Sequence, residues 1–502
     1  MKIKNFNFRI ESKGICILSM DNRDSEVNNI NKNVIEEFFY LVNKIKADEK
    51  IRGVIINSLK KDFHLGYDFK ELIKINNSKV ILNMIFKLNQ TLRSLENSGK
   101  KVIIIHKGRT ASGGLELALC GHYRIASNDS NTIFALNDLD IGVSMGMGGS
   151  QRLPRLLGIN KTMDLILNKK ILTASEALDL KLIDELIDED KIINKAKELI
   201  NSKITTIKTW DDKTKKLNIA KPSDEKNIGL FIGTIAKSHS ITKNHYPAVK
   251  TFLSCIFEGL NCDIDSGLKI ESRYFVWLLN HKETRAMINT LLLNKPKTSI
   301  QNKNIEKLKI ILDKNYAAEG IRLLLKGISP ALIENAGKRL GFNDGPLATA
   351  DNIGLSNIID RLDSSDANIT ALIGLLEKKN RKGKINNAGF FDYYLKKKIK
   401  IWEGLEELVA LSKNQPDVSA IETQLLFLLI NEFSRLADNF LHNIKIEEQD
   451  YFSIKKCNFP AWTGGPYRWI KDYGVKNFIS KSNNFAENLG HRFIPSEKIL
   501  KL

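Results

Sequence analysis

The segment from Lys100 to Gly158 constrains the fold more than any other stretch of this 502-residue sequence. It opens with an apolar, β-branched run at residues 102–106, which predicts a buried strand. A turn follows, and Gly113 and Gly114 stand at the start of a predicted helix. At such a junction, free backbone N–H groups and the positive end of the helix dipole gather. The segment therefore predicts a site that can stabilise negative charge developing on an oxygen atom.

Two carboxylates accompany this turn. Glu116 lies just inside the predicted helix, and Asp138 follows in the segment Leu-Asn-Asp. Carboxylates beside such a site are suited to general acid–base chemistry. Taken alone, the same residues also fit a Gly-rich turn beside a surface helix with a solvated glutamate. The order of the surrounding motifs decides between the two interpretations.

That order resembles the signature of the crotonase (enoyl-CoA hydratase/isomerase) family. After the Gly-rich turn and Glu116, the sequence shows Tyr-Arg-Ile-Ala at 123–126, Gly-Met-Gly-Gly at 146–149 and Arg-Leu-Pro-Arg at 152–155. The resemblance implies an α/β crotonase domain, a superhelix of ββα units, at residues 1–190. It also implies that Glu116 activates the water that attacks Cβ of an acyl-CoA thioester.

The resemblance assigns delivery of a proton to Cα to Asp138. The family has a glutamate after a proline at this position, so the carboxylate here is one methylene shorter. Asp140 lies two residues further on and is a second candidate for the same role. The alignment places Asp138 first.

The resemblance further implies an oxyanion hole. Its donors are the backbone N–H groups of Tyr67 and Gly113, and the substrate-binding residues beside them are Gly66, Asp68 and Gly114. A tyrosine replaces the small residue that the family has at position 67, and its ring narrows the expected pocket. Asp68 is also expected to cap the helix that follows it.

Beyond residue 190 the sequence resembles the α subunits of multifunctional fatty-acid oxidation complexes. The segments 245–248 and 267–275 correspond to their linker, so we expect a helical linker region at 191–300. Those proteins then carry an NAD-binding domain of a 3-hydroxyacyl-CoA dehydrogenase. Here no Gly-x-Gly-x-x-Gly follows a strand, and residues 294–303 read Asn-Lys-Pro-Lys-Thr-Ser-Ile-Gln-Asn-Lys. We therefore expect neither NAD binding nor dehydrogenase activity.

The remainder of the chain contains an internal repeat. The matching motifs are Glu319-x-x-Arg322 with Glu432-x-x-Arg435, and Gly345-Pro346 and Gly354 with Gly465-Pro466 and Gly474. Each copy is predicted to be a long helix, a short helix, a Gly-Pro turn and another helix. The pattern resembles the paired all-helical C-terminal domains of 3-hydroxyacyl-CoA dehydrogenases, which implies an all-α half with domains at 301–400 and 401–502. The polar Asn-Arg pair of that family falls at Ile310-Ile311.

The formal net charge of +19 raises the question of a nucleic-acid partner. Lysines are spread along the chain, and the densest clusters, 378–382 and 396–398, are not interleaved with stacking aromatic residues. We expect solvated faces and no nucleic-acid binding. No apolar run has the length of a membrane span. The five cysteines show no CxxC spacing, which predicts free thiols, a reducing compartment and no zinc or other metal site. We expect a cytoplasmic protein, although the sequence does not distinguish the bacterial cytoplasm from an organelle matrix.

The functional hypothesis is an enoyl-CoA hydratase of fatty-acid β-oxidation, which adds water to trans-2-enoyl-CoA in the syn sense. It needs no cofactor, because acyl-CoA is the substrate. One alternative is an enoyl-CoA isomerase, and another is a catalytically degenerate scaffold that binds acyl-CoA or a thiolase. The resemblance implies a thiolase β subunit or a second copy of this chain as the protein partner.

Overall fold

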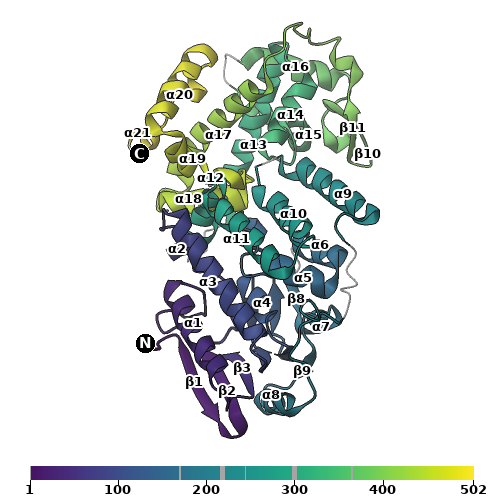
Figure 1. Ribbon diagram of the computed structural model, residues 1–502. Helices are drawn as coiled ribbons and strands as arrows, with labels where there is room; N and C mark the ends of the chain where they lie inside the picture. The colour runs from purple at the N-terminus through teal and green to yellow at the C-terminus, as the bar shows by residue number, and fades with distance from the viewer. Residues whose placement is uncertain (1, 169–170, 215–220, 244, 297–301, 363–365) are drawn as a thin grey trace. The chain divides into compact units, whose positions relative to one another are not determined.

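The computed structural model describes residues 2–168, 171–214, 221–243, 245–296, 302–362 and 366–502 (Figure 1). The chain divides into two compact units. The first contains Met1–His239 and Tyr246–Arg285, and the second contains Ser240–His245 and Ala286–Leu502.

A six-stranded sheet forms the centre of the first unit, in the order β1-β2-β3-β4-β6-β9. Its strands are β1 (Phe6–Glu11), β2 (Ile15–Met20), β3 (Gly53–Ser58), β4 (Lys101–His106), β6 (Tyr123–Ser127) and β9 (Glu185–Ile187). β1 and β2 are antiparallel, and the other neighbours are parallel. The apolar run at 102–105 is buried within β4, as a parallel strand covered on both faces requires.

A second, three-stranded sheet contains β5 (Arg109–Ala111), β7 (Ile133–Ala135) and β8 (Ile171–Thr173). Between β5 and β7 lies the short helix α4 (Gly113–Ala118), all of which is buried. The strand, turn and helix predicted from the sequence are therefore present. Together with the six-stranded sheet, they give this part of the chain an α/β architecture, as the sequence analysis expects.

Helices with one apolar face complete the first unit. They include α1 (Lys32–Ala47), α3 (Ser78–Glu96), α5 (Gly149–Leu157), α6 (Ile159–Leu167), α10 (Pro247–Gly259) and α11 (Ile264–Asn280). Phe252 and Ile256 of α10 are fully buried in the same apolar cluster as Leu153 of α5. Because this burial joins α10 to the sheet domain, the first compact unit extends past the predicted boundary at residue 190.

The second unit is mainly helical. Its longer helices are α13 (Asn302–Leu325), α14 (Pro330–Leu340), α15 (Pro346–Ile353), α16 (Ala367–Lys378), α17 (Val418–Phe440), α18 (Ile446–Cys457), α19 (Pro466–Tyr473) and α20 (Val475–Leu489). They share one apolar core, which spans both of the predicted domains 301–400 and 401–502.

One prediction for this half is wrong, because it is not all-α. β10 (Phe391–Tyr394) and β11 (Lys397–Ile401) form an antiparallel hairpin. Buried Phe391 and Tyr393 alternate with more exposed neighbours, which is the period of a strand with one covered face. The turn residues are Leu395 and Lys396, so the usual Asn-Gly hairpin signal is missing from the sequence.

The two copies of the predicted repeat contain the same kind of helix cap. Glu334 of α14 accepts the N–H groups of Leu347 and Ala348, at 2.8 and 3.1 Å, just after the Gly-Pro turn that starts α15. In the second copy, Asp450 of α18 accepts the corresponding N–H groups of Tyr467 and Arg468 of α19, at 2.8 and 2.9 Å. Each copy therefore holds the N-terminus of its Gly-Pro helix with a carboxylate from the helix before it.

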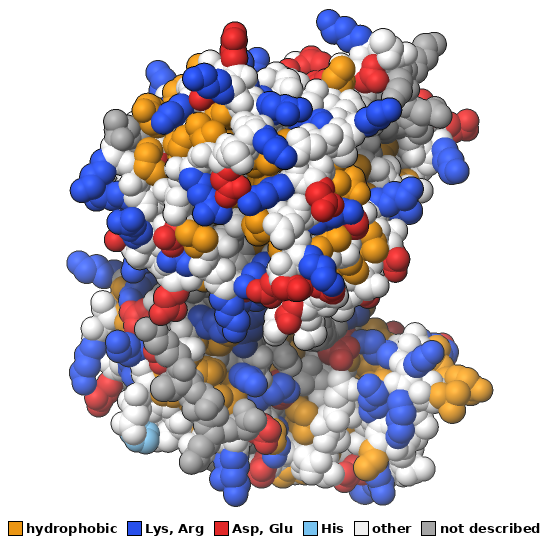
Figure 2. Space-filling view, turned by 90° about the horizontal axis from the view of Figure 1, so that it is seen from below, with side chains coloured by type: hydrophobic (Ala, Val, Ile, Leu, Met, Phe, Trp, Pro, Cys, Tyr) orange, Lys and Arg blue, Asp and Glu red, His pale blue; other side chains and the backbone are white. Residues whose placement is uncertain are grey.

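Within the described residues, no helix is both long enough and apolar enough to cross a membrane. All five cysteines are free thiols. On the face shown in Figure 2, basic side chains are scattered among acidic and apolar ones, as expected from the even spread of lysines.

The repeat predicts a difference between two helix caps. Asp450→Ala leaves two buried N–H groups without an acceptor and is expected to lower the free energy of unfolding by about 2–4 kcal/mol. Asp417→Ala removes an exposed cap that accepts the N–H of Ser419 and should cost about 1 kcal/mol. Urea unfolding of the two variants measures the difference. Equal losses would show that Asp450 does not hold the helix as described.

Candidate functional site

The two predicted oxyanion donors lie on adjacent backbone segments. Ile30 donates its N–H to the carbonyl of Gly66 and accepts the N–H of Asp68, both at 2.8 Å. Successive residues of an extended segment direct their N–H groups to opposite sides, so the N–H of Tyr67 faces away from Ile30. Gly113 is the first residue of α4, where a helix leaves its N–H groups without an intrahelical partner.

Glycines allow these two segments to approach closely. A Cβ built on Gly66, which has φ of +93°, would lie 3.3 Å from the backbone nitrogen of Gly113. A Cβ on Gly114 would lie 2.3 Å from the carbonyl oxygen of His64, so only glycine fits there. The predicted substrate-binding residues Gly66 and Gly114 are thus required by backbone packing at this junction.

Asp68, the third predicted substrate-binding residue, is a helix cap. Its carboxylate accepts the N–H of Glu71 at 3.2 Å and caps the short helix α2 (Phe69–Leu72). The same side chain lines a polar cavity of about 360 Å³ together with Lys2 and Lys4. The capping role predicted from the sequence is confirmed.

Glu116 is 1% exposed and its carboxylate is held by the loop that precedes α5. Oε2 accepts the N–H groups of Met147 and Gly149, each at 2.8 Å, and that of Gly146 at 3.2 Å. Oε1 is 3.4 Å from the same Gly146 nitrogen, a long and weak contact. Oε1 is therefore the oxygen with capacity to accept a proton from a bound water molecule.

Asp138 begins a 3-10 helix, Asp138–Ile141, that follows β7. Its Oδ1 accepts a hydrogen bond from the hydroxyl of Ser112, the residue before α4. Burial raises the pKa of Asp138 to about 6, Asp140 adds to the increase, and the Ser112 hydroxyl opposes it. Both predicted carboxylates are thus joined to α4, because Glu116 lies within this helix and Asp138 bonds to the residue at its N-cap.

A small apolar cavity adjoins Asp138. It measures about 10 Å³, roughly the space of one water molecule. Its lining comprises Asp138, Leu136, Leu139, Val143, Ser144, Met145, Ile166 and Phe252. Asp138 lines this cavity and Asp140 does not, which favours Asp138 as the carboxylate that faces an acyl group.

Glu271 is a member of the site that the sequence analysis missed. It is fully buried on α11, and its Oε1 accepts the N–H of Gly148 at 2.5 Å. Its Oε2 accepts the N–H and the hydroxyl of Ser150, at 2.9 and 2.6 Å. Since Leu268 and Phe275 are buried on the same helix, a glutamate at helical spacing between them was the available signal.

The two buried glutamates influence each other. Burial raises the pKa of Glu116 well above its usual range, and the charge of Glu271 adds to this. The N–H groups of Gly149 and Met147 act in the opposite direction. Burial also raises the pKa of Glu271. The loop therefore holds a carboxylate pair in which a proton is more strongly bound than on an exposed glutamate.

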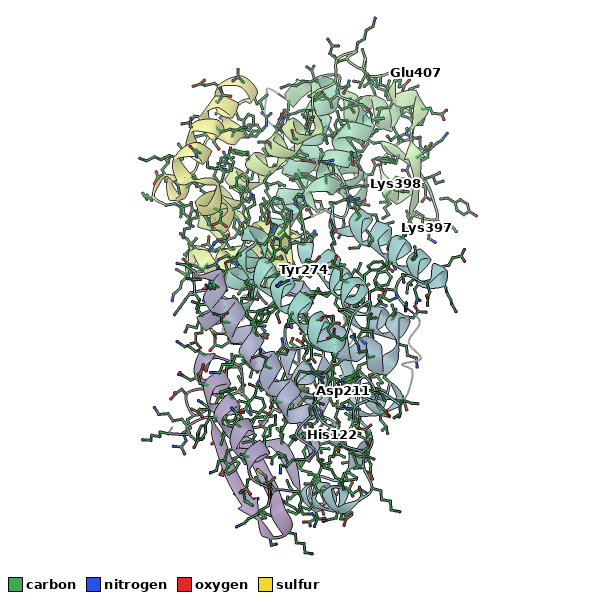
Figure 3. The ribbon with its side chains drawn as sticks, viewed as in Figure 1. His122, Asp211, Tyr274, Lys397, Lys398 and Glu407 are labelled. Carbon is green, nitrogen blue, oxygen red and sulfur yellow. The ribbon has the colours of Figure 1, made fainter. Side chains whose placement is uncertain are left out.

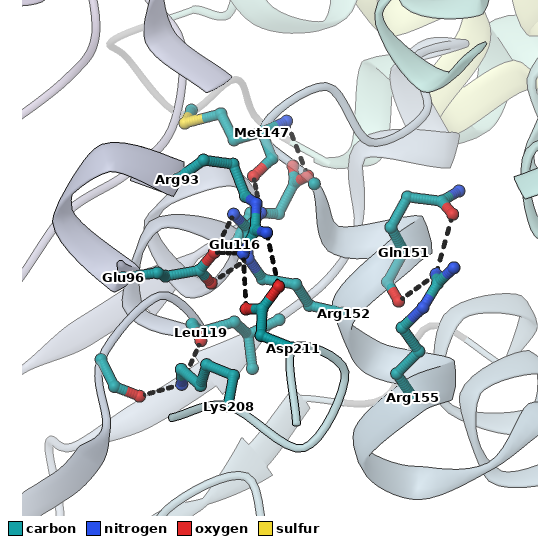
Figure 4. Close-up of polar contacts among 12 residues, drawn as sticks. Arg93, Glu96, Glu116, Leu119, Met147, Gln151, Arg152, Arg155, Lys208 and Asp211 are labelled. Carbon is teal, nitrogen blue, oxygen red and sulfur yellow. Dashed lines mark hydrogen bonds and ion pairs between the residues drawn. The ribbon is translucent and has the colours of Figure 1, made fainter. Parts of the chain in front are cut away.

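The buried side chain of Arg152 holds the loop at residues 146–149 through the backbone of Met147 (Figure 4). Arg152 is fully buried, donates to the carbonyl of Met147 at 3.0 Å and pairs with Glu96 at 2.7 Å. Arg93 extends the network from Glu96 to Asp211. These charge-assisted bonds hold the loop in one arrangement.

Tyr67 fills space at the site with its ring. The ring is buried, and its centroid lies 4.8 Å from that of Phe275. The hydroxyl has no hydrogen-bond partner among the described residues. Burial and the nearby carboxylates of Glu116, Glu271 and Asp138 raise the pKa of Tyr67 well above its usual range, so the hydroxyl stays neutral and able to donate. No group of three or more His, Cys, Asp or Glu side chains in the described ranges could hold a metal ion.

Comparisons with known proteins find similarities in the first part of the chain. Residues 10–229 match the family described as Enoyl-CoA hydratase/isomerase. Similar curated proteins are fatty acid oxidation complex subunit alpha of Shewanella loihica, 30% identical over 288 residues, and that of Vibrio vulnificus, 28% identical over 285 residues. Each match covers 57% of this chain and 40% of the relative, so the aligned part spans less than half of those proteins.

The solved structures to which this chain is similar include two that are titled enoyl-CoA hydratase. One from Mycobacterium avium subsp. paratuberculosis is 17% identical, with a TM-score of 0.41, and the match covers 60% of this chain and all of that one. One from Bacillus anthracis is 21% identical, with a TM-score of 0.37, covering 57% and 96%.

The hydrogen bond from Ser112 to Asp138 predicts a pH effect. Because the hydroxyl stabilises the ionised carboxylate, Ser112→Ala should raise the pKa of Asp138 above its value of about 6. NMR titration of the side-chain carboxyl measures it. Ser144→Ala is the control, since Ser144 lines the same cavity and makes no hydrogen bond with the described residues. An unchanged pKa in Ser112→Ala would contradict the described contact.

Glu271 generates a second prediction. Glu271→Gln removes a charge that raises the pKa of Glu116, so Glu116 should ionise at lower pH. It also replaces an acceptor of Gly148 and Ser150 by an amide, which should cost about 1–3 kcal/mol of stability. Carboxyl titration and urea unfolding measure the two effects. Glu258→Gln, an exposed glutamate on the neighbouring α10 that bonds to Tyr274, should change neither.

Proposed function

We propose that this protein adds water in the syn sense to trans-2-enoyl-CoA thioesters in fatty-acid β-oxidation, because residues 10–229 match the enoyl-CoA hydratase/isomerase family. The observation that carries the proposal is the convergence on α4 of two carboxylates and an oxyanion-stabilising junction. The curated relatives, named as fatty acid oxidation subunits, support the same pathway.

In the proposed mechanism, the two backbone N–H groups, Glu116 and Asp138 each have one role. The thioester carbonyl binds the N–H groups of Tyr67 and Gly113, which stabilise negative charge as it develops on oxygen. Glu116 takes a proton through Oε1 as the water oxygen bonds to Cβ, and Asp138 donates a proton to Cα. Return of a proton from Glu116 to Asp138 restores both carboxyl groups. The net change is addition of one water molecule across the double bond.

The state of Asp138 suits the role of acid. Its pKa of about 6 keeps a fraction of the side chain protonated near neutral pH. A bound acyl chain would exclude more water from Asp138 and raise this pKa further.

We also propose that the protein lacks NAD-dependent dehydrogenase activity and needs no cofactor. The sequence has no dinucleotide-binding fingerprint. Within the described residues of the second unit, the strands are those of an antiparallel hairpin, whereas a dinucleotide fold needs a parallel sheet. Ile310, at the position that the resemblance assigns to a polar residue, is 52% exposed on α13.

The helical half is proposed to contain two dehydrogenase C-terminal-like domains, and the repeated carboxylate caps at Glu334 and Asp450 support a duplication. A thiolase β subunit or a second copy of this chain remains the proposed partner. A cytoplasmic location remains a prediction.

An enoyl-CoA isomerase is the second candidate. The observation that favours it is the difference between the two carboxylates. Oε2 of Glu116 accepts hydrogen bonds from three backbone N–H groups. Asp138 accepts one side-chain hydrogen bond, from Ser112, and lines the cavity. An isomerase moves one proton between two carbons of the acyl group, and Asp138 alone could carry it.

Variants at both carboxylates distinguish the candidates. A hydratase should lose roughly 100- to 10,000-fold in kcat in both Glu116→Gln and Asp138→Asn, because both proton transfers are needed. An isomerase should lose activity in Asp138→Asn and keep it in Glu116→Gln. Loss of the conjugated thioester absorbance measures hydration, and conversion of a 3-enoyl-CoA measures isomerisation.

Asp140→Asn is the matched control for these variants and should leave the rates within a fewfold of the parent. Absence of turnover with both substrate types, while acyl-CoA still binds, would overturn the enzymatic proposal and leave a binding protein.

A further inference from the structure

The hairpin of β10 and β11 has an unusual turn. The turn residues Leu395 and Lys396 have φ of 47° and 64°, the left-handed conformation that a two-residue hairpin loop of this type requires. Glycine and asparagine normally occupy these positions, and a leucine there is strained. The sequence therefore keeps a large apolar side chain at a position where the backbone disfavours it.

This leucine is part of an exposed apolar group. Leu395 is 74% exposed, and Tyr394 and Ile399 beside it are 69% and 61% exposed. Ile385, 75% exposed, is held next to the turn because the ammonium of Lys396 donates to its carbonyl oxygen. We call these four side chains, Ile385, Tyr394, Leu395 and Ile399, the hairpin tip.

The base of the hairpin is fixed. The carboxylate of Asp351 accepts the N–H groups of Phe390 and Phe391 and the hydroxyl of Tyr393, at 2.8 to 2.9 Å. Arg381 donates to the carbonyl of Phe391 at 3.0 Å. The buried face of the hairpin is thus bonded to the helical core, and the tip projects from a rigid support (Figure 1).

The surroundings of the tip are strongly basic. Between residues 378 and 400 the cations are Lys378, Lys379, Arg381, Lys382, Lys384, Lys396, Lys397, Lys398 and Lys400. The one acid in this interval, Asp392, pairs with Arg381 at 2.7 Å. Acids outside the interval pair with three more of these cations: Glu407 with Lys379, Glu334 and Asp344 with Lys398, and Glu403 with Lys400. Among the described residues, no ion pair is present at Lys382, Lys384 or Lys397, so these three cations are left for an external anion. Figure 3 shows Lys397 and Lys398 on the hairpin.

The structure therefore changes the interpretation of two lysine clusters that are separate in the sequence. The segments 378–382 and 396–398 lie against one hairpin, since Arg381 bonds to Phe391 and Asp392. A solvated basic face needs no exposed leucine and isoleucine at its centre. A phosphate backbone binds cations and does not bury aliphatic side chains.

We propose that the hairpin tip inserts into the interfacial region of an anionic lipid bilayer, with the surrounding lysines bound to its headgroups. In such a bilayer the acyl chains lie beneath the phosphate groups of the lipid headgroups. The apolar side chains of the hairpin tip can therefore contact the acyl chains while the lysines around them bind the phosphates. A tyrosine at the edge of the apolar group suits the headgroup level.

Flotation of the full-length protein with vesicles tests the proposal. Binding is expected to vesicles of phosphatidylglycerol and phosphatidylcholine, to be weaker with phosphatidylcholine alone, and to fall at high salt. Leu395→Asn suits the turn better than leucine, so it should fold well and yet lower the partition coefficient about fivefold or more. Leu500→Asn, on the exposed α21 (Glu497–Leu500), is the matched control and should bind like the parent.

A charge variant completes the test. Lys382→Ala with Lys397→Ala should lower partitioning by about tenfold or more. Lys476→Ala with Lys481→Ala, on exposed positions of α20, should have little effect. Equal binding of all variants, or no binding to anionic vesicles, would overturn the proposal. Binding of an RNA probe that is lost in the lysine variant and kept in Leu395→Asn would assign the surface to a polyanion instead.

Discussion

The first unit depends on how five consecutive backbone N–H groups are satisfied. The loop at 146–150 directs them into the interior, and two buried carboxylates accept all five. Glu116 takes three and Glu271 takes two. Without these acceptors, each buried N–H would cost the free energy of a lost hydrogen bond. Since Glu271 lies 123 residues beyond Gly148, the hydrogen bonds of the loop are complete only when α11 is packed against it.

The carboxyl group of Asp138 makes the stability of the folded state depend on pH. Asp138 ionises near pH 6 when folded and near 3.8 ordinarily, so the folded state holds this proton more tightly than the unfolded chain does. Its contribution to stability is therefore complete below about pH 4 and is lost as the pH rises through about 6. Above about pH 6 the ionised carboxylate of Asp138 therefore lowers the stability of the folded state. The Arg152–Glu96 ion pair and the hydrogen bonds of the loop stabilise the same unit and offset this loss.

The sequence was sufficient where the determining residues are close together in the chain. The strand, Gly-Gly turn and helix at 102–118 are a local pattern, and Glu116 and Asp138 were assigned by their places in ordered motifs. Glu271 was missed because its partners are far away in the sequence and a lone glutamate on a helix has no local signature. The hairpin was missed because Leu395 stands in its turn, where the sequence signal of a hairpin is asparagine or glycine.

The two carboxylate caps of the second unit differ in what else they contact. Glu334 and Asp450 each accept the N–H groups at the start of the next Gly-Pro helix, and the two side chains differ in length by one methylene. The longer side chain, that of Glu334, also lies 3.6 Å from Lys398 of the hairpin. The start of α15 and the hairpin therefore share one carboxylate, and a change at Glu334 would affect both elements.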